Sequence, residues 1–125
     1  MLTENDFAPL LNAVPSYAPV WDELKQGVRP ELVAREFCLW LADHVAERAA
    51  KGDFSQLDWL FAAVDQMLRT ANEKLSNALV EGFLEDIIHF ADIHGVDLSR
   101  IAVHINGNEV RPAWEAAYAY TKGPI

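Results

Sequence analysis

Asn72–Gly95, NEKLSNALVEGFLEDIIHFADIHG, is the segment that decides the fold. Asn72 is suited to accept a hydrogen bond from a free amide in a first helical turn. Gly95 is the residue that most readily adopts the left-handed backbone that ends a helix. Apolar residues recur between them in two adjacent stripes: Leu75, Leu79, Phe83, Ile87 and Phe90, and Val80, Leu84, Ile88 and Ala91. Because so wide an apolar face must be covered from more than one side, we predict a long helix in the middle of a bundle.

The rest of the chain also has helical periodicity, with short connections between its segments. The predicted helices span about 3–13, 16–26, 30–51, 53–70, 98–104 and 109–120. Asp53 and Gln56 have the spacing of a capping box, and Asn108 is expected to cap the last helix. No segment combines apolar/polar alternation with enriched β-branched residues. The pattern predicts one all-α domain over residues 1–125, an antiparallel bundle of six or seven helices around the 72–95 helix.

Small and aromatic residues within these helices have simple packing interpretations. Glycine inside a helix costs about 1 kcal/mol relative to alanine, so we expect Gly82 to be compensated by close contact with a neighbouring helix that carries Ala34 and Cys38. Cys38 is interpreted as a packed small side chain rather than a nucleophile. Trp59 falls outside the apolar stripe of its helix, which leaves an exposed interface position and a core position equally open. Trp114 is expected in the core.

The composition limits the classes of function. Hydrophobic residues make up 51% and charged residues 23%, as in globular proteins, and the single cysteine excludes an internal disulfide framework. Nineteen acidic residues against ten basic ones give a net charge of −9. That field opposes nucleic acid and anionic lipid and favours a basic partner, although acidity also serves solubility. Without a signal-like start or an apolar run of about 18 residues, we expect a cytoplasmic protein.

Four polar residues near one face of the central helix are candidates for a metal or catalytic site: Glu85, Asp86, His89 and Asp92. Asp86 and His89 superficially resemble the Glu-x-x-His of di-iron bundles, but those sites need carboxylates from four helices. We therefore predict no metal and no cofactor. A small-molecule- or metal-dependent enzyme that uses these residues with His44 as a general base is the alternative, although no nucleophile motif accompanies His44.

A protein-binding surface is the better interpretation of acidic side chains mixed with aromatic ones. Tyrosine and tryptophan anchor interfaces, and surrounding charge steers a basic partner. The candidate partner-binding residues are Glu81, Glu85, Asp86, Asp92 and Trp59, with Asp43 and Glu47 in addition. A general adaptor, whose bundle groove receives a partner helix, remains a further alternative.

The segments ALVEGFLEDI (Ala78–Ile87) and RPAWEAAY (Arg111–Tyr118) resemble a family of small, bacterial, all-helical proteins of unassigned activity. The resemblance extends over residues 32–118, and the chain departs from it at Ile105, where Ile-Asn-Gly-Asn replaces a Leu-Gly-Pro-like turn. Members of such families occur as immunity proteins of contact-dependent toxin systems. The resemblance thus implies a non-enzymatic immunity protein that neutralises a cognate toxin by binding it, and a toxin nuclease would offer the basic surface.

Overall fold

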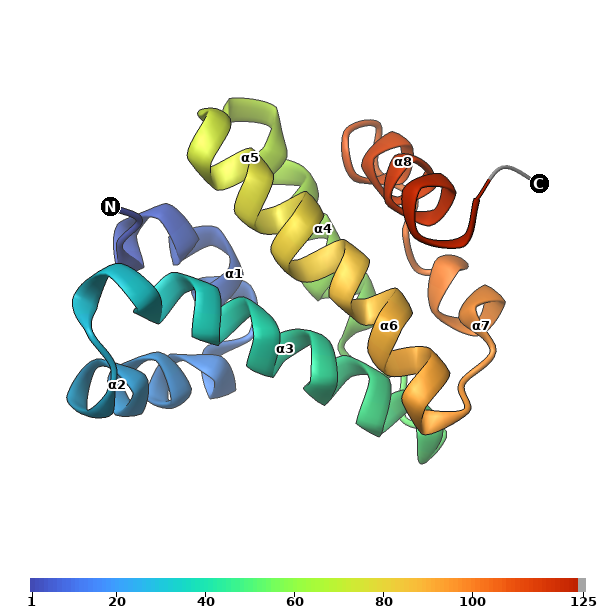
Figure 1. The fold of residues 1–125 in the computed structure, drawn as a ribbon, viewed down its shortest axis with the longest axis horizontal. Helices are drawn as coiled ribbons and strands as arrows, with labels where there is room; N and C mark the ends of the chain where they lie inside the picture. The colour runs from blue at the N-terminus through green and yellow to red at the C-terminus, as the bar shows by residue number, and fades with distance from the viewer. Residues whose placement is uncertain (124–125) are drawn as a thin grey trace.

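A computed structural model describes residues 1–123 as helices joined by short loops, with no strand in that range (Figure 1). The elements are η1 Glu4–Phe7, α1 Ala8–Ala13, η2 Pro15–Tyr17, α2 Ala18–Gly27, η3 Pro30–Leu32, α3 Val33–Ala50, α4 Leu57–Thr70, α5 Glu73–Leu79, η4 Val80–Leu84, α6 Glu85–His94, α7 Leu98–Ala102 and α8 Val110–Lys122. Three 3₁₀ turns lead directly into α1, α2 and α3, and α5, η4 and α6 form one continuous helix. The described residues therefore form seven helices, and the predicted all-α bundle is confirmed.

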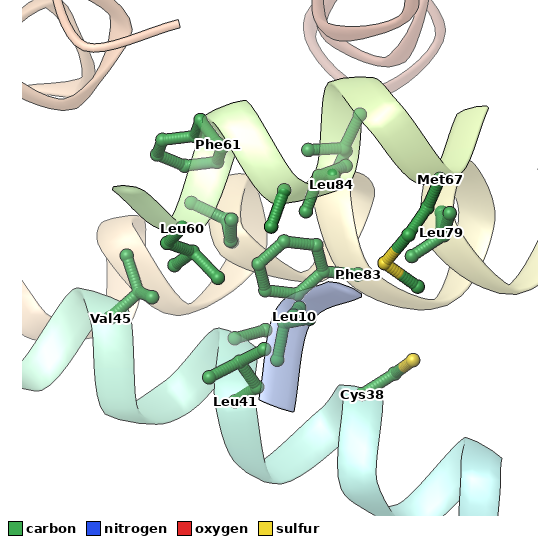
Figure 2. Close-up of a cluster of buried hydrophobic side chains, with 14 of the residues drawn as sticks. Leu10, Cys38, Leu41, Val45, Leu60, Phe61, Met67, Leu79, Phe83 and Leu84 are labelled. Atoms are coloured by element: carbon green, nitrogen blue, oxygen red, sulfur yellow. The ribbon is translucent and has the colours of Figure 1, made fainter. Parts of the chain in front are cut away.

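The continuous α5–η4–α6 helix occupies the middle of the bundle, as predicted. α3 packs against α6 on one side, and α8 packs against η4 and α6 on the other. α4 passes behind α5 and α6 in Figure 1, and α1 packs against α4. Figure 2 shows the core in which these elements meet. Its labelled side chains are Leu10 from α1, Cys38, Leu41 and Val45 from α3, Leu60, Phe61 and Met67 from α4, and Leu79, Phe83 and Leu84 from the central helix.

Local signals at the ends of the central helix act as predicted. The Asn72 side-chain oxygen accepts a hydrogen bond from the backbone N–H of Leu75 at 2.9 Å. Gly95 ends the helix with φ 71°, in the left-handed region that favours glycine. Asp97 then begins α7 by accepting the backbone N–H of Ser99 at 3.0 Å.

The η4 segment, Val80–Leu84, is a single π turn inside the central helix. In an uninterrupted α-helix, Leu75 and Leu79 would point roughly a third of a turn away from the centre of the stripe that follows Phe83. A π turn accommodates one extra residue, and each residue of an α-helix turns the chain by about 100°. The extra residue therefore directs both apolar stripes toward one core. A sequence wheel with uniform periodicity shows them instead as two adjacent stripes.

Gly82 lies within this π turn and next to Cys38, the neighbour that was predicted. A Cβ atom placed on Gly82 would lie 4.0 Å from the Cβ of Cys38, which is an ordinary van der Waals distance. The predicted neighbour is therefore present, but an alanine would fit beside it. The contact with Cys38 does not by itself explain a glycine at this position.

Two predicted helix caps are wrong. Asp53 does not cap α4: its carboxylate accepts the backbone N–H of Ser55 at 3.1 Å and pairs with Arg48, while Gln56 makes no side-chain cap. Nor does Asn108 cap the last helix. The amides at the start of α8 are bound instead by Asp65, a carboxylate on α4.

Candidate partner-binding surface

An open groove of about 930 Å³ lies between α3 and the central helix. These helices run side by side and diverge toward α5, and the chain begins beside their open end (Figure 1). The groove is lined by Met1, Leu2, Glu31, Ala34, Arg35, Cys38, Leu39, Lys74, Asn77, Ala78, Glu81, Gly82 and Asp86. Two of the predicted partner-binding residues, Glu81 and Asp86, therefore border the same concave surface.

Small residues from both helices line the groove between its charged walls. Ala34 and Cys38 come from α3, and Ala78 and Gly82 come from the central helix. Cys38 is 2% exposed, and burial, followed by the nearby Asp86 charge, raises the pKa of its thiol to about 12. The thiol is therefore protonated at neutral pH, which agrees with its interpretation as a packed small side chain.

Glu81, Glu85 and Asp86 form a group of carboxylates that make no hydrogen bond or ion pair within residues 1–123. Partial burial, then the charges of Glu81 and Asp86, raises the pKa of Glu85. Burial also raises the pKa of Asp86, although the charges of His89 and Arg35 oppose that shift. In both cases the folded chain disfavours the ionised form. A cation placed among them would relieve this unfavourable charge.

The other acidic candidates already have partners within the described chain. Asp92 forms an ion pair with Lys122 of α8. Asp43 Oδ1 lies 2.7 Å from His94 Nε2, which ties α3 to the end of α6. Glu47 pairs at 3.2 Å with Lys51, the residue that follows the end of α3. A partner that bound these carboxylates would have to displace existing contacts, whereas Glu81, Glu85 and Asp86 have none to displace.

Trp59 and Trp114 have different environments. Trp59 is 64% exposed, so it does not belong to the core, while Trp114 is 3% exposed and packs in the core as expected. Trp59 lies on α4, and the lining of the groove consists of residues from the N-terminal segment, η3, α3 and the central helix. The structure therefore does not bring Trp59 together with the Glu81–Asp86 group.

The residues of the alternative enzyme site are also separated. His44 stacks on Trp40, with ring centroids 4.7 Å apart, and meets Tyr17 edge-on at 5.7 Å. It lines a small hollow with Tyr17 and Arg48, whereas His89 is exposed on α6. Burial, and then the Arg48 charge, lowers the pKa of His44. Within residues 1–123, no group of three or more His, Cys, Asp or Glu side chains is arranged to hold a metal ion.

Sequence reasoning missed the residues that complete the groove walls. Arg35 and Leu39 lie one turn apart on α3, and Lys74 lies in the first turn of α5. The available signal was that Leu39 is an apolar residue outside both the apolar stripe and the small-residue strip of its helix. Their meeting with Glu81 and Asp86 depends on how α3 and the central helix diverge, which spacing along one helix does not encode.

These features define a class: a small, all-α module in which unpaired carboxylates border an open groove. The chain belongs to the family described as Domain of unknown function (DUF7674), whose model matches residues 7–117 and so includes α3 and the central helix. Neither a curated protein nor a solved structure matches the chain. Every helix within residues 1–123 is too short or too polar to span a lipid bilayer.

Proposed function

We propose that this protein is a non-catalytic binding module that captures a basic protein partner on the surface formed by α3 and the central helix. The partner we propose is a toxin domain, so that the protein acts as an immunity protein. The observation that carries the proposal is the group of three carboxylates, Glu81, Glu85 and Asp86, which have no partner within residues 1–123 and of which Glu81 and Asp86 line an open groove.

Charge supports a basic partner in two ways. Residues 73–94 contain five carboxylates and one lysine, which adds a local negative field to the net charge of −9. Such a field steers a cationic partner and speeds association, with a strong dependence on salt. Burial is the main cause of the raised pKa of Glu85, and the charges of Glu81 and Asp86 add to it, so a cation bound beside this group would offset the second contribution. The long-range field therefore raises the rate of association, and the local carboxylates stabilise the complex once it has formed.

The toxin role rests on the resemblance of Ala78–Ile87 and Arg111–Tyr118 to small helical families that include immunity proteins. The two segments lie in α5–η4–α6 and α8, which pack against each other. A nuclease toxin offers a cationic nucleic-acid cleft, and an acidic protein that fills such a cleft blocks its substrate. This partner therefore fits both the charge and the resemblance.

Co-expression with the neighbouring reading frame tests the proposal, because an immunity protein relieves the toxicity of its cognate toxin. In purified form, E81Q/E85Q/D86N should weaken binding to that gene product by at least about tenfold. The matched control is D43N/E47Q/D92N, which removes three charges that already have partners. Equal loss in both variants would assign binding to bulk charge, and full affinity in the first variant would overturn the proposed surface.

A further inference from the structure

We infer that the groove receives an α-helix of the basic partner, with cationic side chains of that helix placed over Glu81 and Asp86. The inference rests on the proposed binding function and adds the shape and chemistry of the segment that is recognised. Three observations support a helix: the two-helix walls of the groove, its small-residue lining and the position of its charges.

The walls favour a helix over an extended segment. A peptide that binds as a strand needs the free edge of a sheet, and residues 1–123 contain no strand. α3 and α5 instead diverge and leave about 930 Å³ between them. Packed helices approach to interaxial distances of about 8–10 Å, and small side chains at the contact allow the closest approach. Ala78 and Gly82, which are half-buried, provide such a contact surface, and Ala34 and Cys38 are buried beneath it.

The chemistry of the walls defines the face of the incoming helix. Leu39 is 39% exposed on the α3 side, where an apolar side chain can pack against it. Glu81 and Asp86 lie on the central helix, where their carboxylates attract cationic side chains of the incoming helix. Arg35 and Lys74 also line the groove and repel cations there, whereas Glu31 attracts them. The inferred partner is therefore an amphipathic helix with small and apolar residues on one face and Lys or Arg on the flank next to Glu81 and Asp86.

A synthetic peptide tests this shape without knowledge of the natural partner. The probe is a fluorescein-labelled, amidated peptide of about 20 residues, long enough to form a helix, built from Lys, Ala and Leu with Leu and Ala on one face. Its control is a sequence isomer of equal charge that cannot segregate the two faces. Fluorescence anisotropy should show at least tenfold tighter binding of the amphipathic probe, and equal binding of the isomer would overturn the inference.

A groove-filling variant separates this inference from the proposed function. A78L extends a side chain into the groove and leaves all charges in place, so it should weaken probe binding at least tenfold. A116L makes the same change on the exposed side of α8, outside the groove, and should bind normally. If E81Q/E85Q/D86N loses the cognate gene product while A78L keeps both it and the probe, the helix inference is overturned and the proposed function stands. If both variants keep the gene product, both are overturned.

A spectroscopic map keeps the test independent of the folding of A78L. Titration of the wild-type protein with the probe should shift backbone amide resonances of residues 31–39 and 74–86, the two walls of the groove. Shifts confined to those ranges support the inference. Shifts centred on α4 or α8 would overturn it, because neither helix lines the groove.

Discussion

The carboxylate of Asp65 holds the first turn of α8 through Val110: its Oδ1 accepts the backbone N–H groups of Glu109 and Val110, each at 2.8 Å. Asp65 is 7% exposed, and its Oδ2 accepts a hydrogen bond from Arg69 at 3.0 Å. Burial alone would raise the pKa of this carboxyl, but the two amides and Arg69 outweigh it and hold the pKa below its ordinary value. A side chain of α4 thus serves as the cap of a helix more than 40 residues further along the chain.

Replacement of Asp65 by alanine should destabilise the protein by about 2–3 kcal/mol, because D65A leaves two backbone donors at the start of α8 without their acceptor. The midpoint of thermal unfolding should fall by roughly 10 °C. Circular dichroism during chemical and thermal unfolding measures both quantities. D22A is the control, because Asp22 is a surface residue whose ion pair with Lys25 is exposed, and its effect should stay within about 0.5 kcal/mol. Equal stability of D65A and D22A would contradict the capping role.

Gly107 should be required because of Asp65 and not because of its own backbone. A Cβ atom on Gly107 would lie 2.1 Å from Oδ1 of Asp65, whereas its φ is outside the region that favours glycine. G107A should therefore destabilise by about 2 kcal/mol or more through a displaced carboxylate. In a double-mutant cycle with D65A, the two effects should be non-additive by at least about 1 kcal/mol. Additive effects would show that Gly107 acts independently of Asp65.

The contribution of Asp86 to stability should depend on pH in a defined direction. The pKa of Asp86 in the folded protein lies above the ordinary 3.8, so folding favours the protonated carboxyl, and the wild-type protein loses stability as pH rises past 3.8. D86N removes this ionisation and should stabilise at pH 7 by less than about 1 kcal/mol, since water screens a half-exposed group. The gain should vanish near pH 3. D92N is the control: it loses the ion pair with Lys122 and should show no gain in stability at pH 7. An equal gain in D92N and D86N would show that the effect does not come from the Asp86 carboxylate.

The thiol of Cys38 should react slowly with Ellman's reagent in the native protein. Burial and a pKa near 12 leave almost no accessible thiolate at pH 8. In 6 M guanidinium the same thiol should react at least about a hundredfold faster, because both constraints are lost. Cys38 is the only cysteine, so the colour change reports it alone. Comparable rates in the two conditions would contradict its burial between α3 and the central helix.

Sequence reasoning located the features that depend on neighbouring residues. Asn72 and Gly95 bound the central helix because an N-terminal cap and a left-handed C-terminus involve contacts within a few residues. The cap of α8 was missed for the opposite reason. Asn108 stands in the right place in the chain, but Asp65 comes from another helix, and only the packing of α4 against α8 brings it to the amides.

The residues of the candidate surface were likewise predictable only where neighbouring positions on one helix decide them. Glu81 and Asp86 were identified because helical spacing places them off the apolar stripe. Their distinction from Asp92 was not visible, because Lys122 comes from another helix. Trp59 was grouped with them on composition, yet it lies on a helix that does not line the groove.

The π turn at Val80–Leu84 means that the central helix has one residue more than uniform α winding between its two ends would need. If one codon in this turn were deleted, the helix could regain uniform winding with Leu75 and Leu79 still facing the core filled by Phe83 and Leu84. Insertion of a further residue would instead rotate Leu75 and Leu79 by about 100° away from that core. Homologous chains that keep this architecture should therefore tolerate the loss of one residue here more readily than the gain of one.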